Sequence, residues 1–234
     1  MLRHFARGLA DALPGQCAVC RAWPAQPVCE SCVARFAQPQ PRCRRCALPV
    51  PAGVEECGRC VREPPPLDAC AVAVNYDYPW SALIAQFKFQ GQPGWARSFA
   101  TLLRSSPWVE PAIEQAAHVL PMPLARERLL ERGFNQALLL ARCLAPDKTR
   151  PHMLLRTRHT ATQSALDRDA RLANVKGAFA VDPLLAPQLR NVRVVLVDDV
   201  MTSGATVFSA AAVLRRAGAS HITAIVVART EAPS

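Results

Sequence analysis

The 234-residue sequence has no long apolar run. No stretch reaches the roughly 18–20 consecutive apolar residues that cross a bilayer. Polar and charged residues, among them Arg3, His4, Arg7 and Asp11, interrupt the first sixteen positions. We therefore expect no signal peptide and no membrane insertion, and hence a cytoplasmic protein.

Charged residues are also scarce, at 20% of the chain, while 50% of the residues are hydrophobic. That balance excludes a chain that is disordered by composition and allows a packed core. Acidic residues are the minority, since 18 Asp and Glu stand against 28 Lys and Arg and leave a net charge of +10. This excess favours anionic partners such as nucleotides, diphosphates or nucleic-acid backbones, without choosing among them.

Histidines do not cluster. The five lie apart in the sequence without the helical spacing of metal ligands, and no grouping of His, Cys or Ser indicates covalent catalysis or hydrolysis. Cysteines, in contrast, are concentrated, because eight of the ten form four C-x-x-C pairs near the N-terminus. The pairs are Cys17 and Cys20, Cys29 and Cys32, Cys43 and Cys46, and Cys57 and Cys60.

Eight thiolates at this spacing predict two closed, structural zinc sites. The two-residue gap lets one tight turn present both sulfurs while backbone amides stabilise the thiolates. Disulfides would call for an export signal, and a redox dithiol would be a single pair. Iron–sulfur ligation stays an alternative. We expect sequential grouping, 17–32 and 43–60, against a cross-braced competitor, and buried packing roles for Cys70 and Cys143.

Three consecutive prolines at 64–66 indicate an extended linker. We place the module boundary there, with a cysteine-rich module at 1–63 and a second domain at 67–234. In the second domain short apolar runs alternate with helix-period segments, which is typical of an α/β fold with a mostly parallel sheet. Expected strands are 69–76, 118–122, 174–181, 192–198 and 221–228, and expected helices are 81–88, 95–103, 135–144 and 205–217.

Residues 194–206, VVLVDDVMTSGAT, carry the strongest functional signal. We expect a buried strand ending at Asp198 and Asp199, followed by a small hydroxyl-rich loop and a helix. Carboxylates at the crest of a parallel sheet can accept hydrogen bonds from ribose hydroxyls. A helix N-terminus offers amides and a favourable dipole to a phosphate. The phosphate-binding candidates are Thr202, Ser203, Gly204, Ala205 and Thr206.

This segment resembles the signature by which type I phosphoribosyltransferases bind phosphoribosyl diphosphate (PRPP). Together with the four cysteine pairs, FKFQG at 87–91 and RGFNQ at 132–136, it makes the chain similar to the ComF family of competence-associated proteins. That resemblance implies a double zinc ribbon before a phosphoribosyltransferase domain, a five-stranded and largely parallel sheet, Mg²⁺ bound with PRPP, and a role in the uptake of transforming DNA.

The resemblance also implies a diphosphate site and a mobile loop. Arginine grips phosphate oxygens through planar paired donors, and Arg126, Arg128 and Arg132 follow the second main strand, although a plain surface helix would show the same pattern. The loop at 157–171 would close over the reaction centre. Gln163, Arg171, Asn174, Gly177 and Phe179 also fit the family pattern. Asn135 is expected to cap the following helix.

Two functions remain open on the sequence alone. The first is transfer of ribose 5-phosphate from PRPP with release of pyrophosphate, with no catalytic residue or acceptor assigned. The second is a non-catalytic adaptor that binds single-stranded DNA and contacts DNA-uptake or recombination proteins, in which the PRPP site is sensory or vestigial. Arg42, Arg44, Arg45, Arg59 and Arg62 could then track phosphates, with Trp23 and Phe36 as stacking candidates.

Overall fold

A computed structural model describes residues 15–157 and 177–231. These residues form two compact units, one that runs to Gln38 and one that begins at Pro39. The first unit holds the turn at Cys17–Cys20, a bridge between Gly15 and Ala25, and helix α2 (Glu30–Phe36). Among the described residues, no helix combines the length and the apolar character that crossing a membrane requires.

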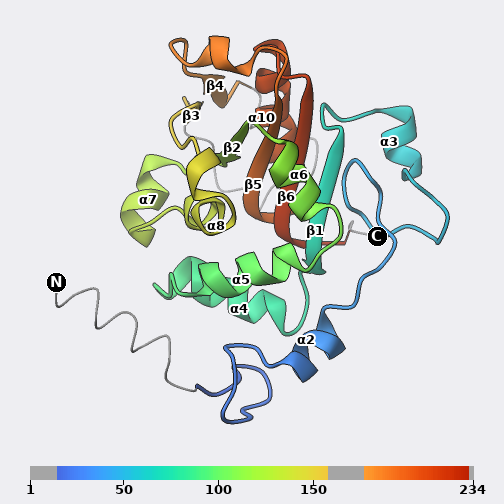
Figure 1. Cartoon of the computed structure of the whole chain (residues 1–234), viewed down its shortest axis with the longest axis vertical. Coiled ribbons are helices and arrows are strands. Elements are labelled where there is room, and N and C mark those ends of the chain that lie inside the picture. The colour runs from blue at the N-terminus through green and yellow to red at the C-terminus, as the bar shows by residue number, and fades with distance from the viewer. Residues whose placement is uncertain (1–14, 158–176, 232–234) are drawn as a thin grey trace. The chain divides into compact units, whose positions relative to one another are not determined.

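The second unit is built on a four-stranded parallel sheet (Figure 1). Its strands, in spatial order, are β1 (Ala69–Asn75), β6 (His221–Arg229), β5 (Arg193–Met201) and β2 (His118–Pro121). Val194 to Val197 are all buried, as expected for a central strand covered on both faces. A separate antiparallel pair joins β3 (Leu154–Arg156) to β4 (Phe179–Val181).

Helices pack against this sheet. Val207, Ala210, Ala211 and Leu214 of α10 share one hydrophobic cluster with Val194 and other sheet residues. Helices α5 and α8 contact the sheet through β6, β1, β5 and β2. The helices of the second unit are α3 (Gly58–Arg62), α4 (Trp80–Phe89), α5 (Trp95–Arg104), α6 (Val109–Gln115), α7 (Arg126–Arg132), α8 (Gln136–Leu144) and α10 (Ala205–Arg216), with 3-10 turns η1 (Pro146–Lys148) and η3 (Ala186–Leu189).

The expected α/β class is confirmed, as are four of the five expected strands and the four expected helices. The fifth strand is a correction. Of residues 174–181, Phe179–Val181 pair with β3 outside the main sheet, and 174–176 lie outside the described residues. On the edge of β2 that does not pair with β5, the described residues form a single bridge, between Val119 and Thr149. Pro151 follows two residues later and has no N–H with which to extend that ladder.

Three of the four residues of the second cysteine cluster pack into the hydrophobic cluster of the sheet unit. Cys43, Cys46 and Cys60 are buried in the same hydrophobic cluster as β5 and α10. The amide of Cys70 on β1 donates to the Arg44 carbonyl at 2.7 Å. The compact units thus divide at Gln38 and Pro39, whereas the motifs suggested residues 63–67. Whether the two motif-defined modules unfold separately stays a prediction to be tested.

We predict that the two clusters differ in what they stabilise. Cys60→Ser should lower the Tm of the main unfolding transition by roughly 5–10 °C, because it removes a thiolate packed into the core of the sheet unit. The matched control is Cys20→Ser, which removes a ligand position that is exposed in the first unit and should leave that transition within about 2 °C of wild type. Differential scanning calorimetry measures both. Equal losses in the two variants would contradict the assignment of residues 43–60 to the sheet unit.

Candidate functional site

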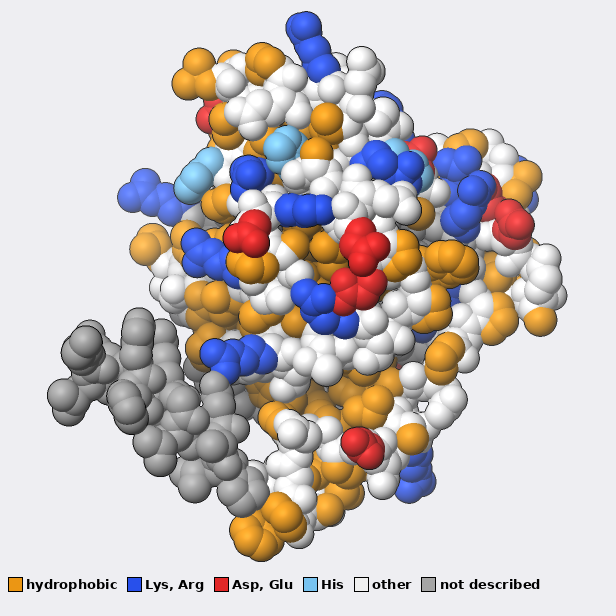
Figure 2. Space-filling model, viewed as in Figure 1, with side chains coloured by type: hydrophobic (Ala, Val, Ile, Leu, Met, Phe, Trp, Pro, Cys, Tyr) orange, Lys and Arg blue, Asp and Glu red, His pale blue; other side chains and the backbone are white. Residues whose placement is uncertain are grey.

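A cavity of about 350 Å³ opens at the carboxyl end of β5. Its walls come from the end of α4, the segment after β2, helices α7 and α8, strand β3, and the β5–α10 loop. The charged residues of the lining are Lys88, Arg128, Arg132, Arg156, Asp198 and Asp199. Figure 2 shows acidic side chains among basic ones near the middle of the face in view. The cavity therefore presents carboxylates and cations side by side.

The two aspartates lie within β5 rather than just beyond it. Backbone pairing with β6 continues through Asp198 and Val200 to Met201, which lies opposite Arg229. The expected end of the strand at residue 198 is therefore wrong by three residues, because nothing in Val200 or Met201 interrupts the ladder with β6. The longer strand holds both carboxylates on rigid backbone, and the Asp198 Oδ1 accepts from the Asp199 amide at 2.9 Å.

Burial and like charge perturb Asp198. Burial and the neighbouring Asp199 charge raise the pKa of Asp198 to about 7, against the opposing influence of Lys88. Asp199 is 8% exposed and its Oδ1 lies 2.8 Å from the Lys88 Nζ. The site thus holds two adjacent acidic groups, one of which forms an ion pair with Lys88.

Lys88 was not assigned to the site from the sequence. It is the penultimate residue of α4, about 110 positions before the aspartates. The lysine is flanked by buried Phe87 and exposed Phe89. Its presence in FKFQG, already noted as a family motif, was the signal available, but no local pattern indicates that the end of α4 faces β5.

The structure brings two of the three candidate arginines into the cavity. Arg128 and Arg132 line it, whereas Arg126 does not. All three belong to α7, a helix none of whose residues is buried. The helix is therefore a surface helix, as the alternative interpretation expected, and two of its arginines reach the cavity. Arg156 of β3 joins them and was missed, because a three-residue strand gives almost no periodic signal.

Unpartnered donors lie beside these arginines. Arg132 stacks over the Phe89 ring at 4.8 Å and donates to the Gln136 Oε1 at 3.2 Å. Its own Nε and the Nε2 of Gln136 are buried without a hydrogen-bond partner among the described residues. Buried donors are rarely left unpaired. Arg132 and Gln136 both line the cavity, so these donors lie in its wall.

The loop after β5 supplies the phosphate-binding candidates. Thr202, Gly204, Ala205 and Thr206 line the cavity, and the Ser203 Oγ accepts from the Ala205 amide at 3.4 Å. Gly204 has φ +83°, and a Cβ there would lie 2.6 Å from the Phe208 ring. The glycine is thus required both by its conformation and by the space around it.

Asn135 caps α8 as expected, because its Oδ1 accepts from the Leu138 amide at 3.2 Å. Its Nδ2 also donates to the Met122 carbonyl at 3.0 Å, which fixes the segment after β2 that forms a cavity wall. Most of the loop expected at 157–171 lies outside the described residues, as do Gln163, Arg171 and Asn174. Gly177 and Phe179 are described, and neither lines the cavity.

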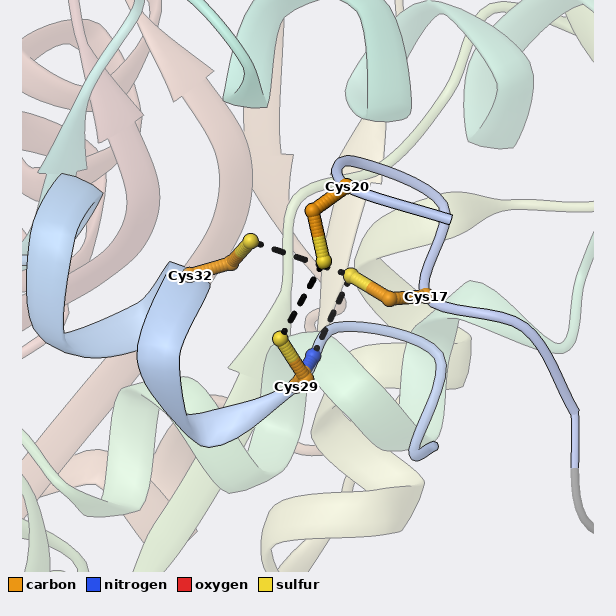
Figure 3. Close-up of side chains that lie close together, drawn as sticks. All are labelled: Cys17, Cys20, Cys29 and Cys32. Carbon is orange, nitrogen blue, oxygen red and sulfur yellow. Dashed lines mark hydrogen bonds between the residues drawn. The ribbon is translucent and has the colours of Figure 1, made fainter. Parts of the chain in front are cut away.

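The cysteines form the two sequential groups that were expected, residues 17–32 and residues 43–60. Figure 3 shows the first of them. Within each group of four, the sulfurs lie within 4.8 Å of one another. Sulfur pairs are 3.8 Å apart for Cys17 and Cys32 and 3.6 Å apart for Cys20 and Cys29. A tetrahedron with Zn–S bonds of 2.3 Å has edges of about 3.8 Å. Each group can therefore hold one zinc ion, as the spacing predicted.

Backbone amides favour the thiolate form of Cys17 in the first group. Burial acts to raise the pKa of Cys17, but hydrogen bonds from amides, among them Cys29 N at 3.4 Å, outweigh it and lower the pKa to about 6. Outside the groups, Cys70 is buried as expected, and burial raises its pKa to about 12. Cys143 is only half-buried.

Comparison with known proteins decides the family. The Phosphoribosyl transferase domain family model matches residues 156–233. Competence protein F of Haemophilus influenzae is 34% identical over 176 residues, which cover 72% of this chain and 76% of that protein. The chain belongs to the ComF family. DNA utilization protein YhgH of Salmonella typhimurium is 31% identical over 227 residues, covering 93% and 98%. Competence protein ComFC of Bacillus subtilis is 29% identical over 157 residues, covering 67% and 62%.

The ComF assignment agrees with the structure. The mostly parallel sheet flanked by helices and the two groups of four cysteines are the features that the resemblance implied. The chain is therefore a phosphoribosyltransferase-like member of a competence-related family. Its ligand and reaction are considered below.

We predict a pH-dependent gain of stability in Asp198→Asn. The folded-state pKa of Asp198 is raised to about 7, so the wild-type fold loses stability as the pH rises from about 4 to 7 and the carboxyl must ionise. The variant avoids that loss. Its free energy of unfolding should exceed that of wild type by on the order of 1–3 kcal/mol at pH 8.5 and by less at pH 5.5. Urea unfolding at both pH values measures the difference.

The control for that experiment is Asp182→Asn, which changes the same functional group at a position whose Oδ1 accepts from the Leu184 amide outside the cavity. It should show no pH-dependent gain. A gain for Asp198→Asn that is equal at the two pH values would contradict the raised pKa.

Gly204→Ala should destabilise the protein. The added Cβ meets Phe208 and Met201 at 2.6 and 2.7 Å, and the φ of +83° disfavours any side chain. We expect a loss of about 2–4 kcal/mol. Gly53→Ala is the matched control, because Gly53 has nearly the same φ but no atom within 4 Å of its Cβ position. If both variants lose the same amount, backbone strain alone accounts for the effect.

Proposed function

We propose that the cavity binds PRPP together with Mg²⁺, and that the protein acts in the cytoplasm in the handling of DNA taken up by the cell. The observation that carries the ligand proposal is the placement of Asp198 and Asp199 on the same strand that leads into the loop at 202–206, opposite two arginines. Ribose hydroxyls, a 5-phosphate and a diphosphate have complementary groups within one cavity.

Each part of the ligand has a matching wall. Asp198 and Asp199 accept hydrogen bonds from the 2′ and 3′ hydroxyls of the ribose. Residues 202–206 at the N-terminus of α10 hold the 5-phosphate through backbone amides and the helix dipole. Arg128 and Arg132 bind the diphosphate, and the unpartnered Nε of Arg132 and Nε2 of Gln136 gain acceptors from its oxygens.

The residues present suit Mg²⁺. The two carboxylates offer the oxygen donors that Mg²⁺ prefers, and the ion would keep several waters and take further oxygens from the ligand. Bound there, it would neutralise charge on the ribose and diphosphate oxygens. Lys88 now lies 2.8 Å from Asp199, and in the loaded site it is close enough in the cavity wall to turn its ammonium toward the diphosphate.

The reaction that such a site supports is displacement of pyrophosphate from C1 of PRPP by an acceptor. Its transition state resembles a ribosyl oxocarbenium ion, so the protein must place charge rather than supply a nucleophile. The positively charged guanidinium groups of Arg128, Arg132 and Arg156 stabilise the negative charge that develops on the leaving diphosphate. The carboxylates hold the ribose in place while the bond to the diphosphate breaks.

The DNA proposal rests on the relatives. Their printed names are competence proteins and DNA utilization proteins, and the net charge of +10 suits an anionic partner. Binding of single strands along the second cysteine cluster is less favoured, because Arg44 and Arg45 pair with Glu56 and Arg42 bonds Ala47 and Asn75. We therefore assign the cavity, rather than this arginine group, the central role.

Calorimetric titration of PRPP with Mg²⁺ tests the ligand. Wild type should bind, and Asp199→Asn should bind at least about 30-fold more weakly, because a loss of about 2 kcal/mol corresponds to that factor. Asp182→Asn should bind like wild type. Absence of binding to wild type would overturn the proposal. Release of pyrophosphate with nucleobase and amine acceptors then decides between transfer and binding alone.

A further inference from the structure

Arg229 is a buried cation that the PRPP proposal does not use. It ends β6 and is 3% exposed. Its Nε donates to the Cys46 carbonyl at 3.0 Å, and its Nη1 donates to the carbonyls of Met201 at 3.0 Å and Thr230 at 2.9 Å, and also to that of Thr202. Among the described residues Arg229 forms no ion pair with a carboxylate, and the acceptors of its guanidinium are these four backbone carbonyls.

These acceptors come from two places with different chemistry. Cys46 is one of the four sulfur donors of the second cluster. Met201 and Thr202 lead into the loop that the PRPP proposal assigns to the 5-phosphate. A buried guanidinium that loses an acceptor pays a large desolvation penalty. The carbonyl of a zinc-ligand residue and the start of the phosphate loop are thus held by one charged group.

The Cys46 carbonyl owes its position to the turn that the metal closes. Cys43 and Ala47 anchor this turn, because the Ala47 amide donates to the Cys43 carbonyl and the Cys43 amide donates to the Leu48 carbonyl, each at 2.8 Å. The Cys46 sulfur lies 3.7 Å from that of Cys57, a tetrahedral edge. Without an ion the four sulfurs lose the common partner that holds them at these distances, and the turn can open.

A second contact follows the same route. The Cys70 sulfur lies 3.8 Å from the Met201 sulfur, and the Cys70 amide donates to the Arg44 carbonyl at 2.7 Å. Arg44 belongs to the Cys43–Cys46 turn. Met201 is also one of the side chains that confine Gly204. The turn therefore reaches the loop both through the guanidinium and through packing.

We propose that Arg229 is a positioning residue that couples the metal-bound geometry of the second cysteine cluster to the loop at 202–206. When the cluster holds zinc, the Cys46 carbonyl fixes the guanidinium, and the guanidinium fixes the carbonyls of Met201 and Thr202. Loss of zinc from this cluster loosens the loop and weakens binding of a 5-phosphate, whereas loss from the first cluster does not. The ligand half of this inference rests on the proposed function, and the loop half does not.

Arg42 provides a matched control. Its guanidinium donates to the Ala47 carbonyl at 3.0 Å and to the Asn75 Oδ1 at 2.7 Å. It therefore ties the same turn to the sheet through β1, but it does not touch the β5–α10 loop. Arg42→Met and Arg229→Met each remove one partly or fully buried guanidinium from the neighbourhood of the second cluster. Coupling to the loop should be lost only in the second.

Amide hydrogen exchange measured by mass spectrometry tests the coupling without a ligand. In wild type, removal of zinc by a chelator should speed exchange of the peptide covering 202–206 about tenfold and by clearly more than exchange of 194–197, whose increase reports only the general loss of stability of the sheet unit. Arg42→Met should respond in the same way. Zinc-loaded Arg229→Met should already exchange fast, and chelation should add less than about twofold. Arg229→Lys, which keeps the charge but loses the fork of donors, serves if the Met variant does not fold.

Two results would overturn the coupling. One is a loop that exchanges at the wild-type rate in the zinc-loaded Arg229 variants. The other is exchange of 194–197 that rises in parallel with 202–206, which would mean that zinc supports the whole sheet unit and not the loop in particular.

A second experiment uses a ligand and depends on the thermodynamic coupling between zinc binding and ligand binding. If zinc in the second cluster strengthens binding of ribose 5-phosphate or PRPP, the ligand must strengthen zinc binding by the same factor. We expect saturating ligand to raise the zinc affinity, measured by equilibrium competition with a colorimetric chelator, at least threefold in Cys20→Ser, Cys29→Ser protein, in which only the second cluster is complete. Adding Arg229→Met should abolish that effect, and adding Arg42→Met should not. If wild type binds neither ligand, the proposed function fails, while the exchange experiment still decides the coupling.

Discussion

Backbone pairing between β5 and β6 runs without a break to Met201 and Arg229, and the remaining features of the site depend on it. A parallel strand that ended at Asp198 would leave the carboxylates on a loop free to turn toward solvent. The longer ladder instead fixes both carboxylates on the strand that closes one wall of the cavity. It also brings the end of β6 beside the start of the loop at 202–206, which is why the Arg229 guanidinium can reach the carbonyls of Met201 and Thr202.

The same ladder makes the site electrostatically strained. Asp198 and Asp199 are adjacent in a partly buried place, and burial together with their mutual repulsion raises the pKa of Asp198 to about 7. Lys88 offsets part of that repulsion from α4. Residues that bind ligands are commonly held in environments that cost stability. Under the proposed function, a ligand that brings hydroxyl donors or a metal ion would relieve this strain.

The sequence predicted those features whose chemistry is local. C-x-x-C spacing identified both sulfur groups, because a turn of that length by itself brings two sulfurs together. The run at 194–206 identified the strand, the carboxylates and the helix start, since each has a short-range preference. Lys88, Arg156 and Arg229 were not assigned, because their roles come from tertiary contacts with residues far away in the sequence, up to 183 positions for Arg229 and Cys46. The prediction of a fifth strand in the main sheet was wrong for a similar reason, since the partner of a strand depends on tertiary contacts and not on the sequence of the strand alone.

The two cysteine groups look alike in sequence but sit in different surroundings. One is enclosed by its own short unit, and the other is embedded in the hydrophobic cluster of the sheet. We therefore expect natural sequence variation to differ between the two groups. Members of the family can lose, shorten or replace the segment around Cys17 and Cys32 without disturbing the cavity, whereas any replacement for the group around Cys46 must still fill the core and offer a carbonyl to Arg229. Natural variation in cysteine number is expected to fall on the first group.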